Sequence, residues 1–203
     1  MYFAAALLAA CAPGAQPETA ARAPHRAPRH NVLLSFASDW ECVISTRAAC
    51  QRAIAEHLRG MFADYDVGFW PAPSRERVDG ITLFFETSDP REWGGGARTV
   101  GYSPERCAPE VVDGTILGAA AIFHCGDRAD HGPSFCAGAS AHEVGHLLGL
   151  EHVVEPASDL MNRYFREGNA FGRAEAATEN LCRGVQDDST MLLAALGAAR
   201  DRE

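Results

Sequence analysis

The segment Ser140-Ala-His-Glu-Val-Gly-His-Leu-Leu-Gly-Leu-Glu-His152 decides how the rest of the chain is interpreted. His142 and His146 are four residues apart, so on a helix their imidazoles lie on one face, about 6 Å apart along the axis. Two imidazole nitrogens at that spacing can bind one zinc ion at roughly 2.0–2.1 Å. Glu143 follows the first histidine and therefore lies beside the metal, where it can accept a proton from a zinc-bound water.

Gly149 explains how a third histidine can reach the same metal. It lies three residues after His146, and glycine adopts a positive φ angle without steric cost. The spacing therefore predicts that the helix ends at Gly149 and that the chain turns back. His152 would then become the third ligand, and the fourth position would stay open for water, as is typical of catalytic zinc sites.

These positions resemble the signature of the metzincin clan of zinc peptidases, H-E-x-x-H-x-x-G-x-x-H followed by a Met-turn. Met161 lies nine residues beyond His152 and matches the Met of that turn. The resemblance implies that Met161 lies beneath the zinc-binding imidazoles and that the protein hydrolyses peptide bonds. It assigns no subfamily, because Val153 after the last histidine matches none of the best-known ones. Tyr164 is one position too late for the metal-reaching Tyr of astacin-like and serralysin-like enzymes.

Around this segment the sequence predicts an α+β domain with strands and helices in layers. The first helix is expected over residues 46–65, because Cys50, Ile54, Leu58 and Met61 form one apolar stripe. A last helix is expected over residues 188–199. The expected strands are residues 31–36, 66–70, 81–87, 99–103 and 119–124.

The metzincin resemblance adds an arrangement to these elements. It implies a twisted, mostly parallel sheet with a backing helix and the active-site helix in an upper subdomain, residues 31–149. A smaller lower subdomain, residues 150–203, would hold one helix. Residues 99–103 would form the edge strand beside the cleft, where an extended substrate is bound by β-augmentation.

The first residues resemble an export signal. Residues 2–10 are apolar but too few to span a bilayer, which takes roughly 20. The end of this run, Leu8-Ala-Ala-Cys11, resembles the lipobox of bacterial lipoproteins, which implies a signal peptide over residues 1–10 and a lipid on Cys11. Residues 11–30, rich in Pro, Ala and Arg, are expected to be a flexible tether. The alternatives are a plain secretory signal, a chance Ala-rich start, and an inhibitory pro-segment in place of the tether.

Six further cysteines indicate three disulfides in an oxidising compartment. Cys42 and Cys50 are close in sequence and form the best pair. The pairs Cys107–Cys125 and Cys136–Cys182 follow by elimination, and by the metzincin resemblance the second would tie the two subdomains together. The absence of a C-x-x-C spacing argues against a cysteine zinc cluster.

The net charge of −9 argues against a nucleic-acid binder, which would need a basic face. The expected protein is a monomeric, extracytoplasmic endopeptidase with one catalytic Zn²⁺, a protein or peptide substrate and a lipid anchor in the membrane. Two alternatives are a non-catalytic surface binding protein on the same scaffold and a zinc amidase acting on a non-protein substrate.

Overall fold

The computed structural model describes residues 28–72, 80–96, 99–104, 106–127, 129–164, 168–175 and 185–199. The expected signal peptide, nearly all of the expected tether, the lipobox Cys11 and Cys182 lie outside the described residues. None of the helices in these ranges combines the length and the apolar character that crossing a membrane requires.

A six-stranded mixed sheet forms the centre of the described fold, with the strand order β2-β1-β3-β6-β4 and with β5 paired to β6. Strands β1, β2, β3 and β6 are parallel, whereas β4 and β5 run antiparallel to β6. This confirms the predicted α+β fold with a mostly parallel sheet. The strands are β1 (His30–Phe36), β2 (Val67–Ala72), β3 (Ile81–Phe85), β4 (Gly101–Tyr102), β5 (Glu110–Val112) and β6 (Thr115–Ile122).

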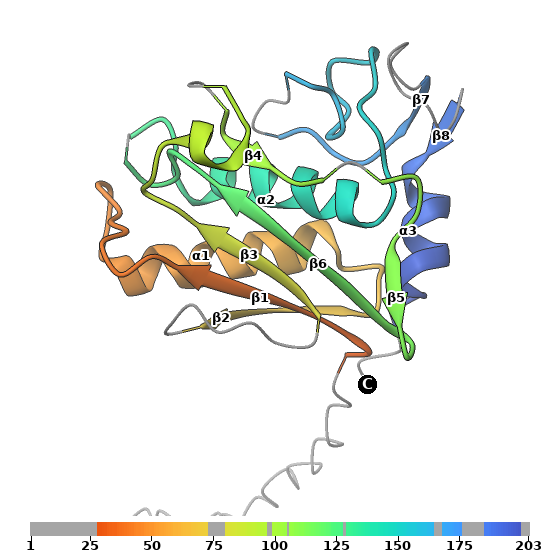
Figure 1. Cartoon of the computed structure of the whole chain (residues 1–203), viewed down its shortest axis with the longest axis horizontal. Helices are drawn as coiled ribbons and strands as arrows, with labels where there is room; N and C mark the ends of the chain where they lie inside the picture. The colour runs from red at the N-terminus through yellow and green to blue at the C-terminus, as the bar shows by residue number, and fades with distance from the viewer. Residues whose placement is uncertain are drawn as a thin grey trace, which may run out of the picture.

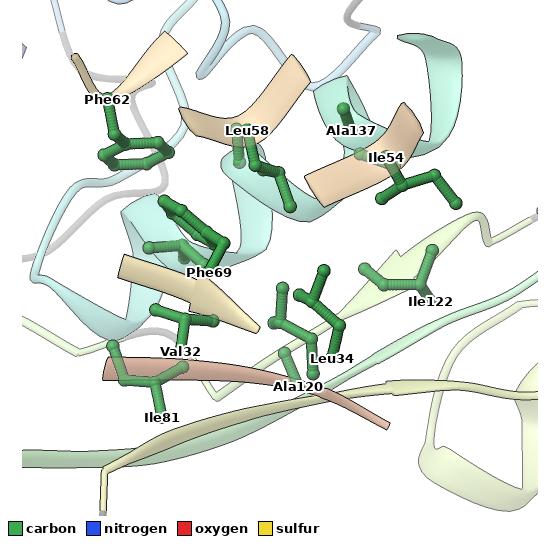
Figure 2. Close-up of a cluster of buried hydrophobic side chains, with 14 of the residues drawn as sticks. Val32, Leu34, Ile54, Leu58, Phe62, Phe69, Ile81, Ala120, Ile122 and Ala137 are labelled. Atoms are coloured by element: carbon green, nitrogen blue, oxygen red, sulfur yellow. The ribbon is translucent and has the colours of Figure 1, made fainter. Parts of the chain in front are cut away.

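Two helices, α1 (Arg47–Met61) and α2 (Pro133–Leu147), pack against each other on one face of this sheet (Figure 1). Figure 2 shows the core between the two layers, where side chains from the helices meet side chains from the strands. The labelled members of this core are Val32, Leu34, Ile54, Leu58, Phe62, Phe69, Ile81, Ala120, Ile122 and Ala137, all buried.

Helix α1 ends four residues earlier than predicted. Phe62 terminates it with a φ angle of −108°, and the chain then turns so that Tyr65 meets Phe62 edge to face. Tyr65 also forms a β-bridge with Ala198, just beyond helix α3 (Asp188–Leu196). Phe62 and Tyr65 are thus buried in a non-helical turn after α1. The spacing of apolar residues alone does not distinguish this turn from a continuation of the helix.

All five predicted strands are present with shifted bounds, and two of these differences have a local cause. Strand β2 continues through Pro71, because in the described sheet it pairs only with β1 and an edge strand tolerates the missing N–H. Strand β6 begins at Thr115, where the hairpin turn Asp113-Gly114 connects it to β5. Both turn residues have positive φ angles, +49° and +77°, as a type I′ hairpin turn requires. Three strands, β5, β7 (Arg173–Glu175) and β8 (Val185–Asp187), and the 3-10 helix η1 (Pro90–Trp93) were not predicted.

The disulfides confirm one predicted pair and correct two. Cys42 is bonded to Cys50, as expected, and Cys125 is bonded to Cys136. The predicted pairs Cys107–Cys125 and Cys136–Cys182 are therefore wrong. The reason is that β6 ends close to the start of α2, so that the cysteine after the strand meets the cysteine in the first turn of the helix. Cys107 is also disulfide-bonded.

Candidate metal centre

Helix α2 presents His142 and His146 one turn apart on the same face. Nδ1 of His142 donates a hydrogen bond to the carbonyl oxygen of Leu160 at 2.7 Å, and Nδ1 of His146 donates to that of Leu150 at 2.9 Å. Because a carbonyl only accepts, these bonds fix the proton of each ring on Nδ1. Both Nε2 atoms consequently offer a lone pair to the space beside the helix.

Gly149 turns the chain back after α2, as predicted, with a φ angle of +91°. A Cβ at this position would lie 2.9 Å from Cα of Ala108. The returning segment is then held on both sides of His152. The backbone N–H and carbonyl of Glu151 bond to the side-chain amide of Gln186, each at 2.9 Å. The N–H of Val153 donates to the carbonyl of Met161 at 3.0 Å.

The three histidines converge through their Nε2 atoms. These atoms are 3.1 Å apart between His142 and His146, 3.2 Å between His142 and His152, and 3.3 Å between His146 and His152. Nitrogens that bind one zinc at roughly 2.0–2.1 Å in a tetrahedral arrangement are about 3.3 Å apart. The three side chains could therefore hold a metal ion, and their donor set and spacing fit zinc.

Burial keeps these rings neutral. It lowers the pKa of His142 to about 3, that of His146 to about 4 and that of His152 to about 3, with repulsion between the neighbouring rings as the next cause. A neutral imidazole is the form that binds a metal. No proton therefore has to leave these rings at neutral pH before a cation can bind.

Glu143 lies next to this cluster and is only 6% exposed. Its Oε2 accepts a hydrogen bond of 2.6 Å from the hydroxyl of Ser103, which follows β4. Sequence reasoning identified Glu143 but missed Ser103, because the contact joins residues 40 positions apart. No local pattern marks such a pair.

Met161 packs against helix α2 and is fully buried. Its Sδ lies 2.5 Å from where a Cβ on Gly145 would be, so the helix needs glycine there for the Met to approach. Asp159 shapes the turn: its Oδ1 accepts from the N–H of Met161 at 2.8 Å, and its carbonyl accepts from the N–H of Asn162 at 3.1 Å. The roles of Gly145 and Asp159 were not predicted.

A pair of buried carboxyl groups supports this turn from below. The carboxyl group of Asp159 and that of Asp188, at the start of α3, lie close enough for each to perturb the pKa of the other. Burial, together with the charge of Asp159, raises the pKa of Asp188 to about 7. The N–H of Gly172 donates to Asp188 at 3.3 Å. The pair thus links α3 to the segment that contains Met161.

A cleft of about 780 Å³ opens in front of the three histidines and Glu143. One wall is the segment around β4, which lies beside α2 in Figure 1. Arg163 and Tyr164 line the cleft farther along the chain, and Tyr164 is 79% exposed. The lining residues from the first wall are Gly96, Thr99, Val100, Gly101, Tyr102, Ser103 and Pro104.

Comparisons with known proteins give distant similarities to solved structures only. No protein-family model matches the sequence, and no curated protein matches it. Among solved structures, metalloproteinase-II from Bacteroides fragilis is similar over 88% of this chain and 55% of that chain, with 16% sequence identity and a TM-score of 0.48. The chain thus spans just over half the length of that protein.

Proposed function

We propose that this chain is a zinc-dependent endopeptidase of the metzincin type. The observation that carries the proposal is the convergence of three neutral imidazoles beside a buried carboxylate, in a cleft bordered by a sheet edge. The Nε2 separations fit a tetrahedral zinc, and because the three histidines line the cleft, a zinc held by them would be open to it. Such an open position distinguishes catalytic zinc sites from structural ones.

His142, His146 and His152 would hold the metal. Zinc bound there would supply a Lewis acid that polarises a carbonyl and activates water as a nucleophile near pH 7. The carbonyl groups of Leu160 and Leu150 orient two of the rings. Glu143 would accept the proton of the attacking water and deliver it to the leaving amine.

The edge strand supports a peptide as the substrate. In the described sheet β4 pairs with β6 on one side only, and its residues line the cleft. An extended peptide can therefore add to this edge as another strand, with its main chain hydrogen-bonded to β4. Arg163 and Tyr164 also line the cleft, and we propose that the peptide extends on both sides of the bond to be cleaved, as in an endopeptidase.

The proposed location is outside the cytoplasm. Two disulfides in the described part of the chain are typical of oxidising compartments. Together with the sequence of residues 1–11, they support an exported protein, for which we propose a lipid on Cys11. The Cys11→Ser variant should then leave the membrane fraction for the soluble fraction, and unchanged fractionation would rule out the lipid anchor.

Incubation with a broad peptide library, followed by mass spectrometry of the products, tests the activity. The zinc-loaded protein should cleave internal peptide bonds, the chelator-treated protein should not, and added zinc should restore cleavage. Cleavage of a cell-wall amide alone would point instead to a non-protein amidase. Zinc binding without any cleavage would point to a binding protein.

A further inference from the structure

Glu143 is held by the edge strand as well as by its own helix. The hydroxyl of Ser103 donates to Oε2 at 2.6 Å, and both side chains are nearly buried, Ser103 being 8% exposed. A hydrogen bond from a hydroxyl to a charged acceptor is shorter and stronger than one between neutral groups. It restricts a side chain with three rotatable bonds that would otherwise have several rotamers available.

Gly101 contacts the same carboxylate from the neighbouring position of the edge. Residues 101 and 103 point to the same side of an extended strand, here toward α2. A Cβ on Gly101 would lie 2.7 Å from Cγ and 2.8 Å from Cδ of Glu143. The Glu143 side chain therefore lies directly against the Gly101 backbone, with Ser103 bonding its far oxygen.

We propose that Ser103 is a positioning residue, which holds the Glu143 carboxylate in the orientation needed for proton transfer. This inference rests on the proposed peptidase function. Its consequence is a shared support: the strand that would bind the substrate also fixes the general base. A peptide paired with β4 is then placed in register with Glu143, and a small displacement of a reacting group can cost about 100-fold in rate.

Variants at the two edge positions test this role. We expect Ser103→Ala to lower kcat about 10- to 100-fold, with KM within about twofold and the zinc content unchanged. Ser103→Thr keeps the hydroxyl and should restore kcat to within about threefold. Gly101→Ala adds a methyl group where Glu143 lies and should lower kcat in the same way.

Ser140→Ala is the matched control. Ser140 is a fully buried serine on α2, and within the described residues its Oγ has no hydrogen-bond partner. It undergoes the same chemical change on the helix that carries Glu143, but it forms no hydrogen bond with the carboxylate. We expect kcat, KM and zinc content to equal those of the wild type.

High-resolution crystal structures of zinc-loaded wild type, Ser103→Ala and Gly101→Ala give a readout independent of activity. Glu143 should adopt one rotamer in the wild type and more than one, or a displaced one, in both variants. If the wild type cleaves no peptide, the proposed function fails, and these rotamers alone decide the inference. A Glu143 rotamer unchanged in Ser103→Ala overturns the proposal, whatever the activity. So does a rise in KM at constant kcat, which would mean that Ser103 contacts the substrate.

Discussion

Substituting Gly149 by alanine should damage both the fold and the metal centre. The φ angle of +91° lies in the left-handed region, which costs a residue with a Cβ roughly 1–3 kcal/mol. The new Cβ would also lie 2.9 Å from Cα and 3.1 Å from N of Ala108. These are backbone atoms that cannot rotate away, so the turn itself must shift. Strain and displacement together should lower the free energy of unfolding by about 2–4 kcal/mol.

The shift should reach His152, three residues farther along the chain. Its Nε2 lies within 3.2–3.3 Å of the other two Nε2 atoms, and a turn that moves by a few tenths of an ångström disturbs this convergence. We expect the zinc affinity to fall about 10- to 100-fold, the range seen when groups that orient metal ligands are altered. Urea unfolding of the zinc-free protein measures the first effect, and competition with a chromophoric chelator measures the second.

Gly60→Ala is the control for this substitution. Gly60 lies exposed on α1, and a Cβ added there would meet no atom of another described segment within 4 Å. Alanine there should stabilise the protein by up to about 1 kcal/mol through helix propensity and leave zinc binding unchanged. If Gly149→Ala instead unfolds within about 0.5 kcal/mol of the wild type and binds zinc equally well, the turn at Gly149 is not what places the third histidine.

Two further substitutions probe the support beneath the metal centre. Met161→Ala should destabilise the protein by about 2–5 kcal/mol, because it leaves a cavity at a fully buried site. Met161→Leu should destabilise it by less than about 1.5 kcal/mol. Equal urea midpoints for the two variants would contradict this packing role. The pKa of Asp188 is raised to about 7 in the folded protein, above the unfolded value of about 3.9. Between pH 4 and pH 7 the Asp188 carboxyl is therefore protonated in the folded protein and ionised in the unfolded one. This difference lowers the free energy of unfolding by about 2–4 kcal/mol as the pH rises from 4 to 7. Asp188→Asn should remove that loss, so the difference between the urea midpoints of the variant and the wild type should grow from pH 5 to pH 7.5; a difference that stays constant would show that Asp188 does not titrate there.

The sequence predicted those parts of the site that depend on local spacing. His142 and His146 share a helix face because of the helical repeat. Gly149 indicates the turn because glycine adopts a positive φ angle without steric cost. The pair Cys42–Cys50 joins a loop to the helix that follows it. Each of these features depends only on residues that are close together in the sequence.

The parts that were missed depend on contacts between distant segments. Ser103 meets Glu143, and Asp159 meets Asp188, only once the strands and helices have packed. The pairing of Cys125 with Cys136 was missed for a different reason. The end of β6 and the start of α2 lie close together, which places Cys125 beside Cys136. Pairing the cysteines by elimination took no account of this proximity.

Activity and zinc content of the wild type and Glu143→Gln, measured on the same samples, test the central claim most directly. Glutamine keeps the shape of the side chain and its contact with Ser103 but cannot accept the proton from water. We predict that both proteins bind one zinc, and that peptide cleavage by the variant falls at least about 100-fold. Equal cleavage by the two proteins, or a wild type that binds zinc yet cleaves nothing in a broad peptide library, would contradict the account.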